Sequence, residues 1–317
     1  MNKIITLAAA IAFAAGIGSA LAQGAPRGGG SRSPGGPPGM MNMPITTQDL
    51  GHGFILLSTF SNTLLAEGND GAIVIDTQFG DGKALVKKLH EVTKLPIRYV
   101  INSNFDGDHT AANALLHAEG AIMVASKGAA ARLAVDQMNR PGNITKALPV
   151  AARPTVIVAT TKTISIPGVT AVITAVPPAH TDGDEFVYFP KANILYIGDL
   201  LHSAEYPFYD GESSGCHCGT FTGQIVALDT ILGIINPDTI VVPGHGPITD
   251  QPHVILLRDM LVWLKATIRA DIAAGMTSAQ FVASNPLAGR PTIFKGPIRG
   301  NANNFLANAY ASIKAGH

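Results

Sequence analysis

The chain has 317 residues, of which 46% are hydrophobic and 14% charged, with 22 basic and 22 acidic side chains. This composition excludes a disordered protein and supplies enough apolar side chains for a large core. The balanced charge gives no electrostatic footprint for nucleic acid or for an anionic membrane surface, so we expect no nucleic-acid partner. It leaves the oligomeric state open.

The N-terminal region predicts export. Residues 1–22 combine Lys3 with an apolar run and end in Ala-Leu-Ala, as a cleaved secretory signal does. A transmembrane anchor is the alternative, but the run is shorter than the roughly 20 apolar residues that spanning needs. We therefore expect a periplasmic or secreted protein with no stable membrane insertion after cleavage. Residues 23–44, mostly Gly, Pro, Ser and Arg, predict a flexible tether, and residues 45–317 carry the folded domain.

The folded domain opens with an alternation of strands and a helix. Three short apolar segments predict strands: 54–60, 61–68 and 71–77. Leu85, Leu89 and Val92 share one face of a helix over residues 81–92, and a further strand follows over 97–103. Strand, helix and strand in this order predict a parallel pair with the helix on one side.

The later segments continue this alternation. A helix is expected from about residue 109 to 120, followed by a strand over 121–125. Five further segments predict strands: 155–159, 162–166, 169–176, 185–190 and 193–199. A helix over 222–234 and a strand over 239–247 come next, and the tail predicts helices at 252–275 and 302–314.

Four separate loops carry residue types that bind metals, and each follows a predicted strand. They are NFDGDH (104–109), AHTDGD (179–184), GDLLH (198–202) and PGHGP (243–247). In open α/β sheets, ligands gather at the carboxyl ends of strands. A single histidine is usually structural, but four such loops together indicate a metal site.

The order and spacing of these loops resemble the metallo-β-lactamase superfamily. The resemblance is carried by DGDHT, AHTDGDEFVYFP, NILYIGDLLHSAEYPF and VVPGHGP. It extends from about residue 45 to the end and is nearest to exported members that include the third subclass of metallo-β-lactamases. It implies an α/β fold, a four-layer αββα sandwich of two mixed sheets packed face to face with helices outside.

The resemblance also implies two metal sites, of which one is intact. The intact site would consist of Asp108, His109 and His245, with Asp199 as a carboxylate able to bridge two ions. Two imidazoles and two carboxylates suit zinc. We therefore expect one Zn²⁺ ion in the intact site.

The second site is rebuilt. It would combine His180 with positions 104 and 106, where the family has histidines and this chain has Asn104 and Asp106. Replacing imidazole by carboxylate moves a site toward harder ions such as iron or manganese. A second zinc, an iron or manganese ion, and no ion in this rebuilt site all remain open, as does a chain without any metal.

The acids of the first loop have other interpretations. Asp108 could cap the following helix, since Asp accepts hydrogen bonds from free backbone amides. Asp106 and Gly107 could simply form a turn. As catalytic groups, Asp108, or Asp106 if it is not a ligand, would orient a water and carry its proton.

The segment after Asp199 would pass over the mouth of the site in the family fold. Tyr206, Tyr209 and His217 are therefore candidates for substrate contact, and His202 could contribute to the rim. Cys216 and Cys218 allow three interpretations: free thiols, an intermolecular bridge, or a pair of soft metal ligands.

The resemblance implies a hydrolase that uses a metal-activated water on a small-molecule ester, thioester or amide, a β-lactam included. The fold cannot choose among these substrates. Asp106 suggests an iron-dependent oxidoreductase as the first alternative. The second is a catalytically weak binding protein whose rebuilt site has decayed.

Overall fold

Residues 43–78, 80, 82–140, 143–207, 218–289 and 302–317 are described by a computed structural model of the chain. The predicted signal, the tether up to residue 42, Tyr209, Cys216 and His217 lie outside the described residues. Every described residue belongs to one compact unit, Ser33–His317. Within the described ranges, no helix combines the length and apolar character that crossing a bilayer would require.

The first sheet has seven strands in the order β1-β2-β3-β4-β5-β6-β9. Their bounds are β1 Thr46–Gly51, β2 Phe54–Ser58, β3 Asn62–Glu67, β4 Ala72–Ile75, β5 Ile97–Asn102, β6 Ile122–Ser126 and β9 Val156–Val158. Strands β1 to β4 form an antiparallel meander, and β4, β5, β6 and β9 are parallel. Helix α1, Lys83–Val92, connects β4 to β5, which confirms the predicted parallel pair.

The second sheet has five strands in the order β10-β11-β12-β13-β14. Their bounds are β10 Thr161–Ile166, β11 Val169–Ala175, β12 Glu185–Phe189, β13 Ile194–His202 and β14 Ile240–His245. All neighbours are antiparallel except β13 and β14, which helix α5, Phe221–Leu232, connects as a parallel pair. Strands β7, Gln137–Arg140, and β8, Asn143–Thr145, form a separate ribbon.

Hydrophobic layers lie between the two sheets and between each sheet and its helices. Alternate residues of each strand meet between the sheets, where Phe54 packs edge-on against Phe189 with ring centroids 4.8 Å apart. The other face of the first sheet packs against α1 and α3, Asn113–Ala118. The outer face of the second sheet packs against α5, α6 (Gln251–Ala273), α7 (Ser278–Ala283) and α8 (Ala302–Lys314).

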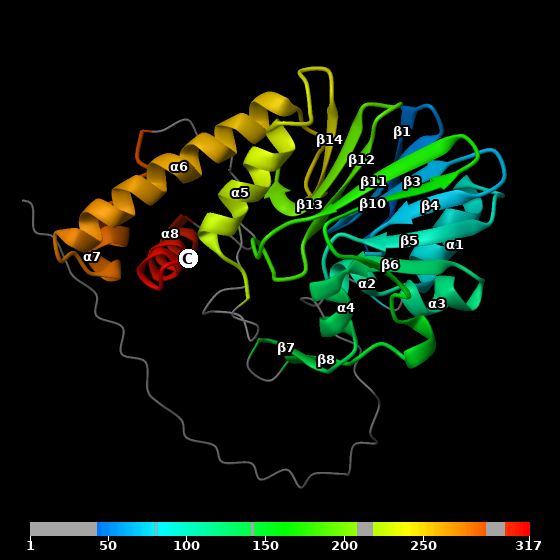
Figure 1. The fold of residues 1–317 in the computed structure, drawn as a ribbon, viewed down its shortest axis with the longest axis horizontal. Coiled ribbons are helices and arrows are strands. Elements are labelled where there is room, and N and C mark those ends of the chain that lie inside the picture. The colour runs from blue at the N-terminus through cyan, green and yellow to red at the C-terminus, as the bar shows by residue number, and fades with distance from the viewer. Residues whose placement is uncertain (1–42, 79, 81, 141–142, 208–217, 290–301) are drawn as a thin grey trace, which may run out of the picture. The chain divides into compact units, whose positions relative to one another are not determined.

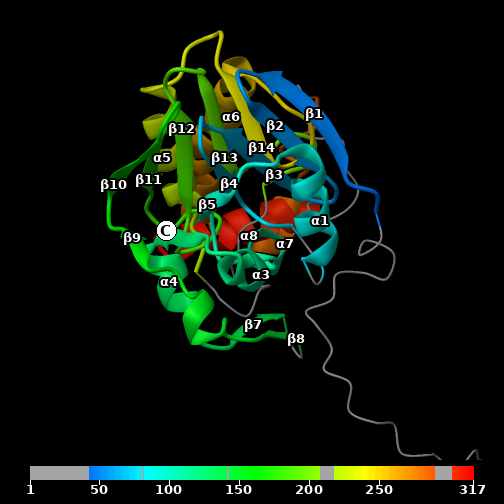
Figure 2. The ribbon, with the colours of Figure 1, turned by 90° about the vertical axis from the view of Figure 1, so that its right-hand side faces the viewer.

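The architecture is therefore the expected αββα sandwich. Figure 1 shows α1 and α3 beside β4 and β5, with α5 and α6 on the opposite side beside β13 and β14. In Figure 2, α1 lies in front of the strands and α5 and α6 lie behind them. Both sheets are mixed, as the resemblance implies.

Several boundaries differ from the prediction for physical reasons. The helix expected from residue 109 is two short helices, α2 (Gly107–Thr110) and α3, which are separated at Ala111 and Ala112. Strand β13 continues three residues beyond Asp199 because it pairs with β14 past an irregularity, His202 opposite His245. Strand β1 was not predicted, because its exposed polar sequence TTQDLG carries no alternation and is held by pairing with β2. Helix α4, Lys127–Leu133, was also missed.

Candidate metal centre

The four predicted loops converge at one end of the sandwich. The residues they bring together are Asp106, Asp108, His109, His180, Asp199, His202 and His245. Three groups of these have ligand atoms within 4.8 Å of one another: Asp108 with His109 and His245, Asp199 with His202 and His245, and Asp106 with His180 and Asp199. The intact and the rebuilt site thus meet at Asp199.

The separations around Asp199 fit donors that share a cation. The Nε2 atoms of His109, His180 and His245 lie 3.2, 3.4 and 3.5 Å from Asp199 Oδ2. Donors about 2.0–2.2 Å from a tetrahedral zinc are about 3.3–3.6 Å apart. The His109 contact, at 3.2 Å, also meets the distance of a hydrogen bond, but it is longer than the about 2.7–2.9 Å of a charge-assisted one. The intact site therefore has the donor set and the spacing for a divalent cation.

The negative charge of the buried carboxylates also favours a bound cation. Burial acts to lower the pKa of His245, but Asp199 and Asp108 outweigh it and raise that pKa to about 9. Burial likewise opposes protonation of His109, yet Asp199, Asp76 and Asp108 raise its pKa well above the usual value. Buried carboxylates thus attract protons to both imidazoles where a metal would supply the positive charge.

Asp76 orients His109. Its Oδ2 lies 2.7 Å from His109 Nδ1 and accepts hydrogen bonds from Ser103 Oγ at 2.6 Å and the Tyr196 hydroxyl at 2.8 Å. Because Nδ1 donates to this carboxylate, the Nε2 lone pair is directed at the site. Asp76 was not among the predicted site residues, although it directly follows the apolar run AIVI of β4, which pairs with β5.

His245 is oriented by a different partner. Its Nδ1 lies 2.8 Å from the carbonyl oxygen of Phe60, which leaves Nε2 directed at Asp199 and Asp108. Asn62 donates to the carbonyl oxygens of Pro243 and Gly246 at 2.8 and 2.9 Å. The β2–β3 turn therefore holds the loop that carries His245.

Gly244 allows β14 to approach Asp199. A Cβ atom at this position would lie 2.0 Å from Asp199 Oδ1, far inside van der Waals contact. Any side chain here would push the bridging carboxylate away from the imidazoles.

The rebuilt site contains Asp106 and His180 but not Asn104 as a ligand. His180 Nε2 lies 3.2 Å from Asp106 Oδ2. Asn104 Oδ1 instead accepts a hydrogen bond from the Asp106 backbone N–H at 2.8 Å, and Asn104 is fully buried. The rebuilt site thus offers one imidazole and two carboxylates.

The positions of the two acids bear on their alternative interpretations. Asp106, not Asp108, is the N-cap residue of α2, and its side chain makes no capping hydrogen bond. Asp108 lies in the first turn of α2. Asp106 does lie at a turn, but its carboxylate faces His180.

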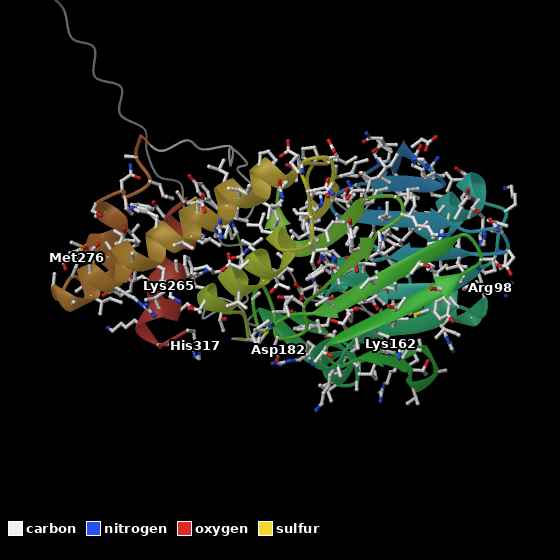
Figure 3. The ribbon with its side chains drawn as sticks, turned by 45° about the horizontal axis from the view of Figure 1, so that its top comes forward. Arg98, Lys162, Asp182, Lys265, Met276 and His317 are labelled. Atoms are coloured by element: carbon white, nitrogen blue, oxygen red, sulfur yellow. The ribbon has the colours of Figure 1, made fainter. Side chains whose placement is uncertain are left out.

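The loop that carries His180 is fixed from both sides. Thr181 donates to Asp184 from its backbone N–H at 2.9 Å and from its hydroxyl at 2.6 Å. Asp182, labelled in Figure 3, pairs with Arg132 of α4 at 2.6 Å. This turn holds His180, which is 2% exposed, toward Asp199.

Of the three residues predicted to contact substrate, Tyr206 is described by the structure. Tyr206 stacks on Phe305 of α8 with ring centroids 5.4 Å apart and belongs to the hydrophobic layer outside the second sheet. The structure thus gives Tyr206 a packing role, and its contact with substrate stays a prediction. Tyr209 and His217 lie outside the described residues. Cys218 is disulfide-bonded, so the free-thiol and metal-ligand interpretations are wrong for that residue.

Comparisons with known proteins agree with this geometry. The family model described as the metallo-beta-lactamase superfamily matches residues 58–245. The chain belongs to the metallo-β-lactamase superfamily. Members of this superfamily are metal-dependent hydrolases that include lactamases and an alkylsulfatase. No curated protein matches the sequence.

Solved structures of superfamily members share the fold at low sequence identity. A metallo-β-lactamase from Pontibacter korlensis is 19% identical with a TM-score of 0.55, over 68% of this chain and 99% of that one. FIM-1 from Pseudomonas aeruginosa, in its mono-zinc form, is 20% identical with a TM-score of 0.55, over 70% and 96%. The sec-alkylsulfatase Pisa1 from Pseudomonas sp. is 16% identical with a TM-score of 0.65, over 84% of this chain and 50% of that one.

Proposed function

We propose that the chain is an exported metal-dependent hydrolase that cleaves an ester, thioester or amide bond of a small molecule. The observation that carries the proposal is the spacing of three imidazoles at 3.2–3.5 Å around one oxygen of Asp199. Charge-assisted hydrogen bonds are typically shorter, about 2.7–2.9 Å. The donor set of the intact site, with two imidazoles and two carboxylates, favours zinc.

A bound divalent cation lowers the pKa of a bound water toward neutrality and polarises the bond that is cleaved. The chain itself supplies orientation and proton transfer. Asp76 and the Phe60 carbonyl orient Nε2 of His109 and of His245 toward Asp199. Both imidazoles would therefore bind a cation there without reorganisation.

Asp106 is the better placed of the two proposed proton carriers. Its side chain is 17% exposed, whereas those of Asp108 and Asp199 are 5% and 2% exposed. A carboxylate at the solvent side of the site can accept a proton from water and deliver it to a leaving group. Asp108, 3.2 Å from His245 Nε2, is placed to bind the cation.

Sulfate esters are a second candidate substrate class. The alkylsulfatase aligns with 84% of this chain, whereas the two lactamases align with 68% and 70%. The larger share favours testing alkyl sulfates beside lactams, thioesters and carboxylic esters. Identity of 16% carries the fold alone, so the substrate must come from assay.

An iron-dependent oxidoreductase remains the alternative from another class. One imidazole and two carboxylates in the rebuilt site are a harder donor set than the family's histidines, which favours iron or manganese there. A binding protein with little catalysis would need neither a metal nor turnover.

Metal analysis of protein purified without added ions separates these functions. We expect about one zinc per chain and hydrolysis that a chelator abolishes and zinc restores. Asp199→Asn should lose both the metal and turnover, while the exposed Asp70→Asn should keep both. Stoichiometric iron with no hydrolysis would favour the oxidoreductase, and a chain that binds no metal would refute the proposal.

A further inference from the structure

His202 is a buried histidine that the hydrogen bonds of the protein do not explain. It is the last residue of β13 and is 2% exposed. Within the described ranges, neither of its ring nitrogens has a hydrogen-bond partner. Buried polar atoms are almost always paired with protein, water or an ion. A phenylalanine or leucine would fill this position without leaving two polar atoms unpaired.

The position of the ring points to the metal site. His202 Nε2 lies 3.5 Å from Asp199 Oδ1, the oxygen that is turned away from the other imidazoles. The His202 and His245 rings are 4.8 Å apart, with an interplanar angle of 65°. Ligand atoms of Asp199, His202 and His245 all lie within 4.8 Å of one another. The separation from Asp199 is the one that two donors to a tetrahedral ion would have, about 3.3–3.6 Å.

His245 limits how these groups can share ions. Its Nδ1 faces the Phe60 carbonyl oxygen at 2.8 Å, so only Nε2 is available to a metal. One imidazole nitrogen has one lone pair and binds one ion. The group of Asp108, His109 and His245 and the group of Asp199, His202 and His245 therefore cannot hold separate ions. An ion bound to His245 can therefore take its other ligands from either group.

We propose that His202 is a direct ligand of the cation that His245 and Asp199 hold. This inference rests on the metal-dependent function proposed above. Positions 104 and 106, where the family resemblance implies histidines, are Asn104 and Asp106 in this chain. His202 would supply one imidazole to the centre beside the other oxygen of Asp199. With His109, His202 and His245 available, the ion has a nitrogen-rich environment that suits zinc better than magnesium or manganese.

Cadmium-113 provides a direct test in the full chain. The protein is labelled with nitrogen-15 in its histidine rings, stripped of metal and loaded with cadmium. One-bond coupling between cadmium and a ring nitrogen identifies each ligand. We expect the cadmium resonance of the intact site to couple to three ring nitrogens, and to two in His202→Phe and in His202→Gln. His117→Phe, a half-buried histidine of α3 outside the site, should leave three.

Metal affinity and melting temperature distinguish loss of a ligand from poor folding of the His202→Phe variant. Loss of an outer hydrogen-bond partner of a ligand typically weakens metal binding 10–100-fold, so loss of a ligand should exceed about 100-fold. The melting temperature of metal-free His202→Phe should match or exceed that of the wild type, and its rise on adding cadmium should be smaller.

The outcomes separate this inference from the proposed function. Cadmium bound stoichiometrically but with the same number of coupled nitrogens in wild type and His202→Phe would overturn the ligand role of His202 alone. A wild-type chain that binds no cadmium or zinc would overturn the metal-dependent function and this inference together.

Discussion

Replacing Asp76 by asparagine should damage both the stability of the protein and its affinity for metal. Asp76 is fully buried, and three groups converge on its Oδ2: His109 Nδ1, Ser103 Oγ and the Tyr196 hydroxyl. Asparagine has one acceptor oxygen where the carboxylate has two, so its Nδ2 faces either these three groups or the backbone N–H of Ser103, which donates to Oδ1. Removing one partner of a buried charged pair costs about 3–5 kcal/mol, and we expect a loss of that size in the free energy of unfolding.

The effect on metal binding follows from the tautomer of His109. An asparagine lacks the negative charge that holds the proton on Nδ1. Where its Nδ2 faces Nδ1, it favours the tautomer with the proton on Nε2, the atom that faces Asp199. That proton occupies the lone pair the cation needs. We expect zinc affinity to fall about 10–100-fold, as it does when the outer partner of a ligating histidine is lost.

Urea unfolding of metal-free protein and competition with a chromogenic zinc chelator measure the two effects separately. Asp70→Asn is the matched control, because Asp70 is exposed and only its backbone oxygen accepts a hydrogen bond, from Arg98. If Asp76→Asn unfolds like the wild type and binds zinc equally well, Asp76 does not orient His109.

Three other perturbations test the site. Gly244→Ala places a Cβ atom 2.0 Å from Asp199 Oδ1. Zinc content should therefore fall well below one per chain, while the α-helical circular dichroism signal is kept. Full zinc occupancy in this variant would contradict the packing argument. In metal-free protein, burial lowers the pKa of His245 but neighbouring carboxylates raise it from 6.5 to about 9. The resulting stabilisation, up to about 3 kcal/mol, should be complete below pH 6.5 and lost as the pH rises through 9; urea midpoints that increase over this range would refute it. Asp106→His gives the rebuilt site a second imidazole beside His180. The zinc content, measured by mass spectrometry, should therefore rise from about one toward two per chain. A fall in both zinc content and turnover would instead assign Asp106 a specialised role.

The sequence predicted the convergence of the ligands because their positions follow from strand order. Asp108 and His109 follow β5, Asp199 lies in β13, and His245 ends β14. The parallel pairing of β13 with β14, and of β4 with β5, brings carboxyl ends of strands together. The alternation of apolar segments and helices predicts each parallel pair, and the family resemblance implied that the loops of the two sheets share one site.

Details that depend on long-range packing could not be predicted. Tyr206 was expected at the mouth of the site, but its ring stacks on Phe305, 99 residues later, and no local pattern reports that contact. His202 looked like a loop residue, because the extension of β13 depends on its partner β14. Asp76 can be recognised as a site residue only once β4 and β5 are known to be neighbours.

The most direct measurement for the shared-cation claim is an anomalous difference map at the zinc edge from crystals grown with zinc. We expect a peak within about 2.0–2.3 Å of Asp199 and of the Nε2 atoms of His109 and His245. No peak there, with zinc found instead at a surface pair such as His90 and Glu119, would contradict the account.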